Sequence, residues 1–290
     1  TPQELNKTVE WINSAQASAH SAFAFLTMLT SLKLHEVLGL HVAFSESEQE
    51  GFKQSNECYG VINFESGMYW RKELEITDCY QPSDKEQKWL SQHSEWLALP
   101  IPRQFLGLLR TFFNPYQAGL IEQILPNNIV VNAGDFLTQA CREIVHNFGF
   151  NRSLKHKVLR YVLYGCVVSK YGKHKASLIF ANNEFGLSTW HYYMSDTVYN
   201  AQIAFIDTCA DLLGFDFDRR IDFTENSSVV GSKLAINNKA FSELLAERIA
   251  VLNASLRAVK KSKSLEDLRE TYNQLSSYTV LMFSVVTSHR

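Results

Sequence analysis

The first third of the chain changes from helical to strand-like spacing of its apolar residues. The residues Thr1-Pro2-Gln3-Glu4 form a capping box with proline at the first helical position, which predicts a helix start. Apolar residues through 22–40 predict two packed helices, and the polar, acidic segment 45–57 predicts a loop. Short β-rich runs in 59–76, on either side of Glu65-Ser66-Gly67, predict a hairpin.

The middle of the chain begins with a strand and then becomes helical. Segment 97–113 predicts a short strand followed by a helix, and the prolines at its centre place that strand at a sheet edge. From Ala133 to Tyr171 the spacing is helical, with breaks near Gly149 and after Lys170. A loop at 177–189 and a helix at 195–214, closed by Gly214, are expected next.

The C-terminal part divides into a linker and a helical extension. Segment 215–237 is polar and without period, and is predicted to link residues 1–214 to the extension. A helical pair is expected over 238–290, whose second helix is capped at Ser264. The fold class is therefore α+β and mostly helical, with helices flanking a small antiparallel sheet.

Composition limits the function classes. The 290 residues are 46% hydrophobic and 20% charged with a net charge of −2, which indicates a globular chain without an overall electrostatic grip on polyanions. Five scattered cysteines predict buried thiols in a reducing compartment. Neither a membrane span nor a signal peptide is recognised, so a cytoplasmic protein with no membrane partner is expected. Glycine-rich phosphate loops and metal motifs are not found, so no cofactor and no metal are predicted.

One interval has a strong local charge. Between Glu143 and Glu184 there is no acidic residue, although the interval is rich in cations. This pattern predicts contact with a polyanion, and the alternative is a solvated helical face paired with acids elsewhere. The candidate DNA-binding residues are Arg152, Lys155, His156, Lys170, Lys173 and Lys175. Lys157 and Arg160 lie at i and i+3 on one helix face, where both could reach one phosphate.

Taken in order, several segments resemble the tyrosine recombinase (phage integrase) family. Leu29–Leu40 reads LTSLKLHEVLGL and is similar to the family's early helix motif, with Ser31 in place of glycine and Lys33 in place of the first arginine. Segment 97–102 resembles the strand that ends in prolines, and Lys157 with Arg160 fits the following His/Lys-x-x-Arg helix. Thr189 and Tyr193 fit the last motif, and the resemblance covers roughly 15–205.

The resemblance implies double-stranded DNA as partner and strand exchange through a 3′-phosphotyrosyl intermediate, without metal. Tyr193 would be the nucleophile, with Tyr192 as its close rival. Cationic side chains would stabilise charge on the phosphate, and a hairpin lysine would protonate the leaving oxygen. The implied cationic residues are Arg160, Lys157 and Lys33 at the phosphate and Lys72 as the acid, with Lys85 as its alternative.

Departures from the pattern leave other interpretations open. Lys33 lacks the fork of arginine, and the histidine expected before the tyrosine falls at Glu184. The chain end at Arg290 also resembles the first-arginine motif, in which case the visible chain would be the N-terminal region of a larger recombinase. A non-catalytic DNA-binding or assembly protein and an unrelated helical interaction protein are the other hypotheses. The C-terminal helices are expected to mediate self-association or to bind a protein partner.

Overall fold

The computed structural model divides the chain into two compact units. Unit 1 comprises Thr1–Gln81 and Ser91–Ala235, and unit 2 comprises Pro82–Leu90 and Ile236–Arg290. The structure describes residues 2–55, 58–73, 87–88, 90–148, 154–181, 195–217, 228–232, 235, 237–259, 266, 268–270, 272–273 and 276–277.

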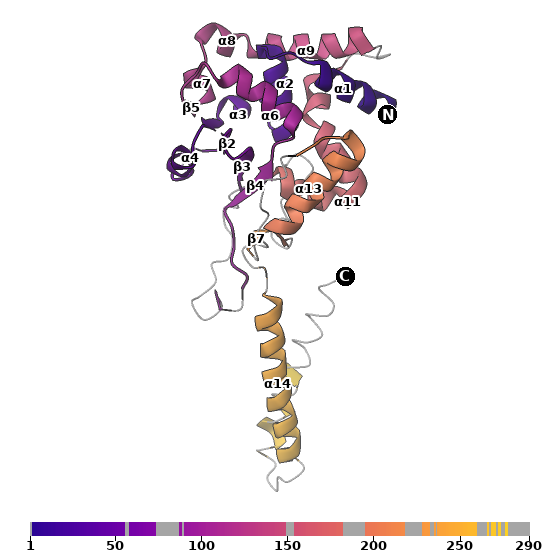
Figure 1. The fold of residues 1–290 in the computed structure, drawn as a ribbon. Helices are drawn as coiled ribbons and strands as arrows, with labels where there is room; N and C mark the ends of the chain where they lie inside the picture. Colours follow the sequence, from indigo (N-terminus) through magenta and orange to yellow (C-terminus); the bar gives the residue numbers. More distant parts are fainter. Residues whose placement is uncertain are drawn as a thin grey trace. The chain divides into compact units, whose positions relative to one another are not determined.

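Helices dominate both units, as Figure 1 shows, and the predicted class of mostly helical α+β is confirmed. The helices are α1 (Pro2–Ser14), α2 (Ala19–Thr30), α3 (Leu34–Leu38), α4 (Glu46–Lys53), α6 (Arg103–Phe113), α7 (Ile121–Ile124), α8 (Asn127–Val131), α9 (Ala133–Phe148), α10 (His156–Arg160), α11 (Val162–Phe180), α13 (Val198–Leu213) and α14 (Asn238–Val259). The strands are β1 (His41–Ala43), β2 (Gly60–Asn63), β3 (Met68–Lys72), β4 (Trp96–Pro100), β5 (Gly119–Leu120), β6 (Ser195–Thr197) and β7 (Val229–Gly231).

The main sheet has the order β4-β3-β2-β1-β5. The predicted hairpin is β2–β3, which turns at Gly67 with φ +66°, and the proline-bounded strand β4 lies at the edge as expected. The prediction of an antiparallel sheet is wrong in one pairing, because β1 and β2 run parallel. The long connection over 44–59 allows this, since parallel neighbours need a crossover and cannot be joined by a tight turn.

That crossover contains α4, where the polar pattern predicted only a loop. Ser45 caps the helix by accepting a hydrogen bond from the Glu48 backbone N–H at 3.3 Å, and the Glu48 carboxylate accepts from Phe44 N–H at 2.8 Å. Gln49 Oε1 accepts from Asn63 Nδ2 at 2.8 Å, which fastens α4 to β2. The reciprocal cap and this buried bond outweigh the weak apolar periodicity.

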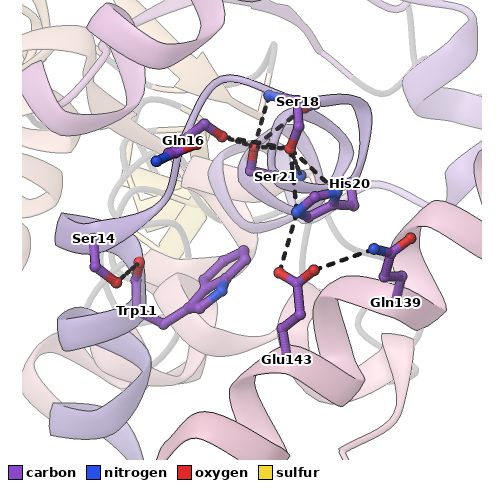
Figure 2. A network of polar contacts seen from close by, with 8 residues as sticks. All are labelled: Trp11, Ser14, Gln16, Ser18, His20, Ser21, Gln139 and Glu143. Carbon is purple, nitrogen blue, oxygen red and sulfur yellow. Dashed lines mark hydrogen bonds and ion pairs between the residues drawn. The ribbon is translucent and has the colours of Figure 1, made fainter.

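The helix α2 lies at the centre of the core and is tied to α9. From Ala22 to Thr30 its residues are buried. Figure 2 shows how the start of the helix is fixed: Ser18 caps it, and His20 Nε2 lies 3.1 Å from the Glu143 carboxylate on α9. Gln139 Nε2 donates to the other Glu143 oxygen at 3.3 Å. Glu143, the acid that precedes the cation-rich interval, therefore points toward α2.

The later helices agree with most of the predicted breaks. The helix α9 ends at Phe148, next to Gly149, and α11 has a non-helical residue at Gly172 with φ 85° and ψ 168°. The helix α13 ends at Gly214 in the left-handed conformation. The loop predicted at 177–189 is wrong for 177–180, which continue α11, and 182–194 lie outside the described residues.

The predicted linker 215–237 is wrong at both described ends of that segment. Phe215 is buried in the core, and β7 pairs antiparallel with β6, so these residues belong to unit 1. The sequence did not predict this pairing, because a strand of three residues is too short to show an alternating pattern, and the surrounding residues are polar. In unit 2, α14 begins at Asn238, the residue where the helical extension was expected. Among the described residues, no helix combines the length and apolar character that spanning a membrane requires.

Candidate functional site

The junction of α2 and α3 is bonded directly to α10. Ser31 ends α2 with a left-handed backbone (φ 55°), and its Oγ donates to the Arg160 carbonyl at 2.9 Å. Arg160 Nε donates in return to the Ser31 carbonyl at 2.6 Å. Two candidate residues distant in sequence, Lys33 and Arg160, are therefore held on adjoining backbone.

Aromatic and capping contacts orient this junction. The Tyr161 ring centroid lies 5.0 Å from the Arg160 guanidinium carbon and 6.0 Å from Lys157 Nζ. Lys33 is exposed, and its backbone N–H donates to the Glu36 carboxylate at 2.6 Å as α3 begins. Arg160 is half-buried. The two cations on α10 thus share one aromatic support.

A cleft of about 770 Å³ adjoins the junction. Its lining includes Leu32, the neighbour of Lys33, together with the predicted general acid Lys72 on β3. It also includes Ala181, which ends α11 and precedes segment 182–194. Both candidate nucleophiles, Tyr192 and Tyr193, lie in that segment and so outside the described residues, as do Lys85, Arg152, Glu184 and Arg290.

Three acidic residues line the cleft: Glu36 and Glu73 are engaged in local bonds, and Glu122 is exposed. The Glu73 carboxylate lies 2.5 Å from His93 Nε2 and also accepts from the Gly231 backbone N–H. Glu36 accepts from the Lys33 N–H already described. These bonds offset part of the negative charge that a bound phosphate would meet.

Cys58 and His41 also face the cleft, with Sγ and Nδ1 3.4 Å apart. Burial raises the pKa of Cys58 and lowers the pKa of His41, so both groups are neutral at pH 7. A reactive thiolate–imidazolium pair needs the opposite shifts. This pair therefore does not provide an activated nucleophile.

A second hollow, a groove of about 840 Å³, lies between α9 and α10. One wall is the face of α9 that carries Arg142 and His146, and the other is the start of α10 with Lys155, His156 and Lys157. The floor is formed by the apolar residues Cys141, Val145 and Leu154, and none of the residues that line the groove is acidic. We call the five basic residues of these walls, Arg142, His146, Lys155, His156 and Lys157, the basic rim, and all five are exposed.

Sequence reasoning missed two members of the basic rim. Arg142 and His146 are four residues apart on α9 and share a face, a spacing that the sequence does display. Arg142 precedes Glu143 and so lies outside the acid-free interval, and His146 lies at its start, ahead of the denser cations that follow residue 150. Across the groove, His156 Nε2 lies 2.8 Å from Thr138 Oγ1 and joins the two walls.

Two of the candidate DNA-binding lysines are paired with acids. Lys170 Nζ lies 2.7 Å from Asp207 and 2.5 Å from Asp211 on α13, and Lys175 is bonded to Asp196. For these two the alternative interpretation, a helical face paired with acids elsewhere, describes the observed contacts. Lys173, in contrast, is exposed on α11.

Metal ligands and known relatives provide no further assignment. Within the part of the chain that the structure describes, no cluster of three His, Cys, Asp or Glu side chains could hold a metal ion. Comparison of the chain with protein-family models, with curated proteins and with solved structures finds no match.

Proposed function

We propose that this chain binds double-stranded DNA and acts on it as a tyrosine-recombinase-like strand-exchange protein. The observation that carries the proposal is the cleft beside the α2–α3 junction. Residues from the early helix motif, from the lysine strand and from the end of α11 all border it, and Arg160 is bonded at its margin through Ser31. Two segments named by the family resemblance, the early helix motif and the lysine strand, line the cleft, and this supports the proposal.

The backbone at Ser31 supports the same proposal. The family motif has glycine at this position, and the chain here adopts the left-handed conformation that glycine favours. Serine keeps that conformation by bonding Arg160, so the substitution preserves the local geometry.

In the proposed reaction, a tyrosine hydroxyl attacks a backbone phosphorus atom and an O–P bond forms as the bond to the 5′ oxygen breaks. The phenolic proton passes to solvent water, and Lys72 gives a proton to the departing 5′ oxygen. Arg160, Lys157 and Lys33 stabilise the charge on the phosphate oxygens, for which Lys33 offers a point charge in place of a fork. Re-attack by a 5′ hydroxyl of another strand reverses these steps and completes the exchange.

The basic rim is proposed to hold the DNA backbone. Exposed cations on two helices that flank an apolar floor can follow successive phosphates, and such contacts position a duplex without reading its sequence. Each phosphate neutralised releases counterions, so binding through the rim is sensitive to salt.

A trapping experiment tests the chemistry. A duplex nicked near the cleavage point releases a short fragment and leaves the protein covalently attached, which a denaturing gel detects. We expect an adduct with the wild-type chain and none with Tyr193→Phe or, if Tyr192 is the nucleophile, with Tyr192→Phe. Tyr199→Phe on α13 is the matched control and should react normally. An adduct that persists in both candidate variants rules out these nucleophiles.

A salt titration tests the DNA interface. Arg142→Ala and Lys155→Ala should each reduce the slope of log K against log salt by about 1, because each removes one phosphate contact. Lys170→Ala and Lys175→Ala serve as controls, since those lysines are paired with acids. Binding that does not weaken with salt would contradict the rim as a phosphate contact.

A second candidate function is a DNA-binding or assembly protein that keeps the fold without cleavage. The observation that favours it is Lys33, which stands exposed where the motif has arginine. Salt-sensitive DNA binding without any covalent adduct would establish this alternative. In that case, Lys33→Arg would leave the trapping experiment negative.

The helical extension is proposed to bind a second copy or a protein partner. In unit 2, large apolar side chains stand exposed, among them Ile249 at 50% and Tyr272 at 68%. Side chains of this kind usually mark an interaction surface when they gather. Sedimentation equilibrium of the wild-type chain and of Ile249→Glu tests self-association, which the variant should weaken.

A further inference from the structure

Arg71 is a buried guanidinium next to the candidate acid Lys72. It lies on β3 opposite Gly60 of β2 and Leu97 of β4, and only 3% of its surface is exposed. It also contributes to the lining of the cleft. Among the described residues, no carboxylate lies within ion-pair distance of it, so its burial is not explained by a salt bridge.

Two nitrogens of the guanidinium donate to main-chain carbonyls, and Nε is buried without a hydrogen-bond partner among the described residues. Nη2 donates to the Leu178 carbonyl at 2.6 Å, and Nη1 donates to the Lys72 carbonyl at 3.3 Å. Leu178 belongs to the last turn of α11, where carbonyls have no partner within the helix and carry partial negative charge. One side chain therefore joins the lysine strand to the end of a helix 107 residues away.

The helix end that Arg71 holds leads directly to the tyrosines. Ala181 follows as the left-handed cap of α11, and segment 182–194 begins at the next residue. The position of the last turn of α11, which ends in Ala181, is thus fixed by the same guanidinium that holds the backbone of Lys72. A shift between β3 and α11 would move the acid relative to the nucleophile.

We propose that Arg71 is a positioning residue, which keeps Lys72 on β3 and the last turn of α11 in register for the transfer of the phosphoryl group. The inference rests on the proposed function. Arg71 is buried and bonded to protein carbonyls, so it acts through the two groups it holds and does not itself grip the phosphate. DNA affinity should accordingly not depend on it, whereas the rate of adduct formation should.

The test compares Arg71→Met with Arg71→Lys and with a matched control. Arg110 on α6 also donates to a main-chain carbonyl, that of Phe64, but does not line the cleft, so Arg110→Met removes a similar bond elsewhere. We expect Arg71→Met to bind DNA within about twofold of the wild type, because the basic rim is untouched. Its rate of adduct formation should fall by about 100-fold, the effect of a misplacement near 1 Å. Arg71→Lys, which keeps the charge and a donor, should recover part of this loss, and Arg110→Met should react normally.

Hydrogen exchange supplies a readout that does not require activity. Amides of residues 177–181 should exchange roughly tenfold faster in Arg71→Met than in Arg110→Met, because the last turn of α11 loses its anchor. Adduct formation at the wild-type rate, or unchanged exchange at 177–181, would overturn the proposal. A wild-type chain that forms no adduct would instead refute the proposed chemistry, and the exchange experiment would still decide whether Arg71 holds the helix end. If Arg71→Met does not fold, Arg71→Lys takes its place, with intermediate exchange and adduct rates expected.

Discussion

At the scale of single residues, backbone strain gathers around the candidate site. Among the described residues other than glycine, positive φ occurs at Ser31 and Ala181. Each ends a helix and each adjoins the cleft or its margin. A left-handed conformation costs a non-glycine residue roughly 1–2 kcal/mol. Ser31 offsets this cost by hydrogen-bonding Arg160, whereas the methyl group of Ala181 cannot form a hydrogen bond.

Ala181→Gly is therefore expected to stabilise the chain. Glycine adopts this conformation freely, and the free energy of unfolding should rise by about 0.5–1 kcal/mol after its greater unfolded entropy is deducted. Urea unfolding measures the change. Ala176→Gly is the control, because Ala176 is fully buried within the same helix and its replacement should lower stability by about 1 kcal/mol. Similar losses in both variants would show that the backbone at Ala181 is not strained.

At the scale of elements, α11 consists of two helical pieces with different surroundings. Before Gly172, Lys170 and Tyr171 bond the acids of α13. After it, Ala176–Phe180 are buried, and the helix end is held by Arg71. The break after Lys170 was predictable because only glycine readily adopts the conformation found at residue 172.

The two glycines of α11 give a matched pair of substitutions. Neither Gly165 nor Gly172 has a heavy atom near the position of an added Cβ, so any difference comes from the backbone. Gly172→Ala should lower the free energy of unfolding by about 1–3 kcal/mol, since its backbone is nearly restricted to glycine. Gly165→Ala should raise it by roughly 0.5–1 kcal/mol through helix propensity. Thermal or urea unfolding distinguishes the signs, and a stabilising Gly172→Ala would contradict the kink.

At the scale of the whole molecule, the core is assembled with thiols that stay protonated. Cys58, Cys141, Cys166 and Cys209 are free and buried, as predicted for the described cysteines, and Cys79 lies outside them. Burial raises the pKa of Cys141 and of Cys166 from 9.0 to about 11. In the unfolded chain the same thiols lose their protons at lower pH.

Stability should therefore fall in alkaline solution. The pKa of each thiol is higher in the folded chain than in the unfolded chain. Its contribution to the free energy of unfolding is therefore complete below pH 9 and is lost as the pH rises toward 11. The loss approaches roughly 2–3 kcal/mol for each thiol, at 1.36 kcal/mol per pKa unit. Urea unfolding at pH 8 and pH 10 measures it. The double variant Cys141→Ala/Cys166→Ala should have a lower free energy of unfolding than the wild type at both pH values. Its free energy of unfolding should fall less between pH 8 and pH 10, and a fall equal to that of the wild type would exclude these thiols as the cause.

Much of the secondary structure could be predicted from short stretches of sequence. The start of α1, the turn at Gly67, the edge strand before Pro102 and the end of α13 at Gly214 each depend on residues within one or two turns. Proline and glycine act there by restricting or releasing backbone angles, which requires no distant partner. The cations of α10 were likewise visible as a pattern.

The tertiary structure alone decided which of these elements meet. Ser31 and Arg160 are separated by 129 residues, and Arg71 and Leu178 by 107, yet each pair is hydrogen-bonded. Lys155 and Lys170 belong to the same acid-free interval, but α13 brings carboxylates only to the second. The spacing of apolar residues within one segment predicts the hydrogen bonds that the segment makes within itself. The partner of a charge or a strand depends on how separate segments pack, and this is determined by the whole chain.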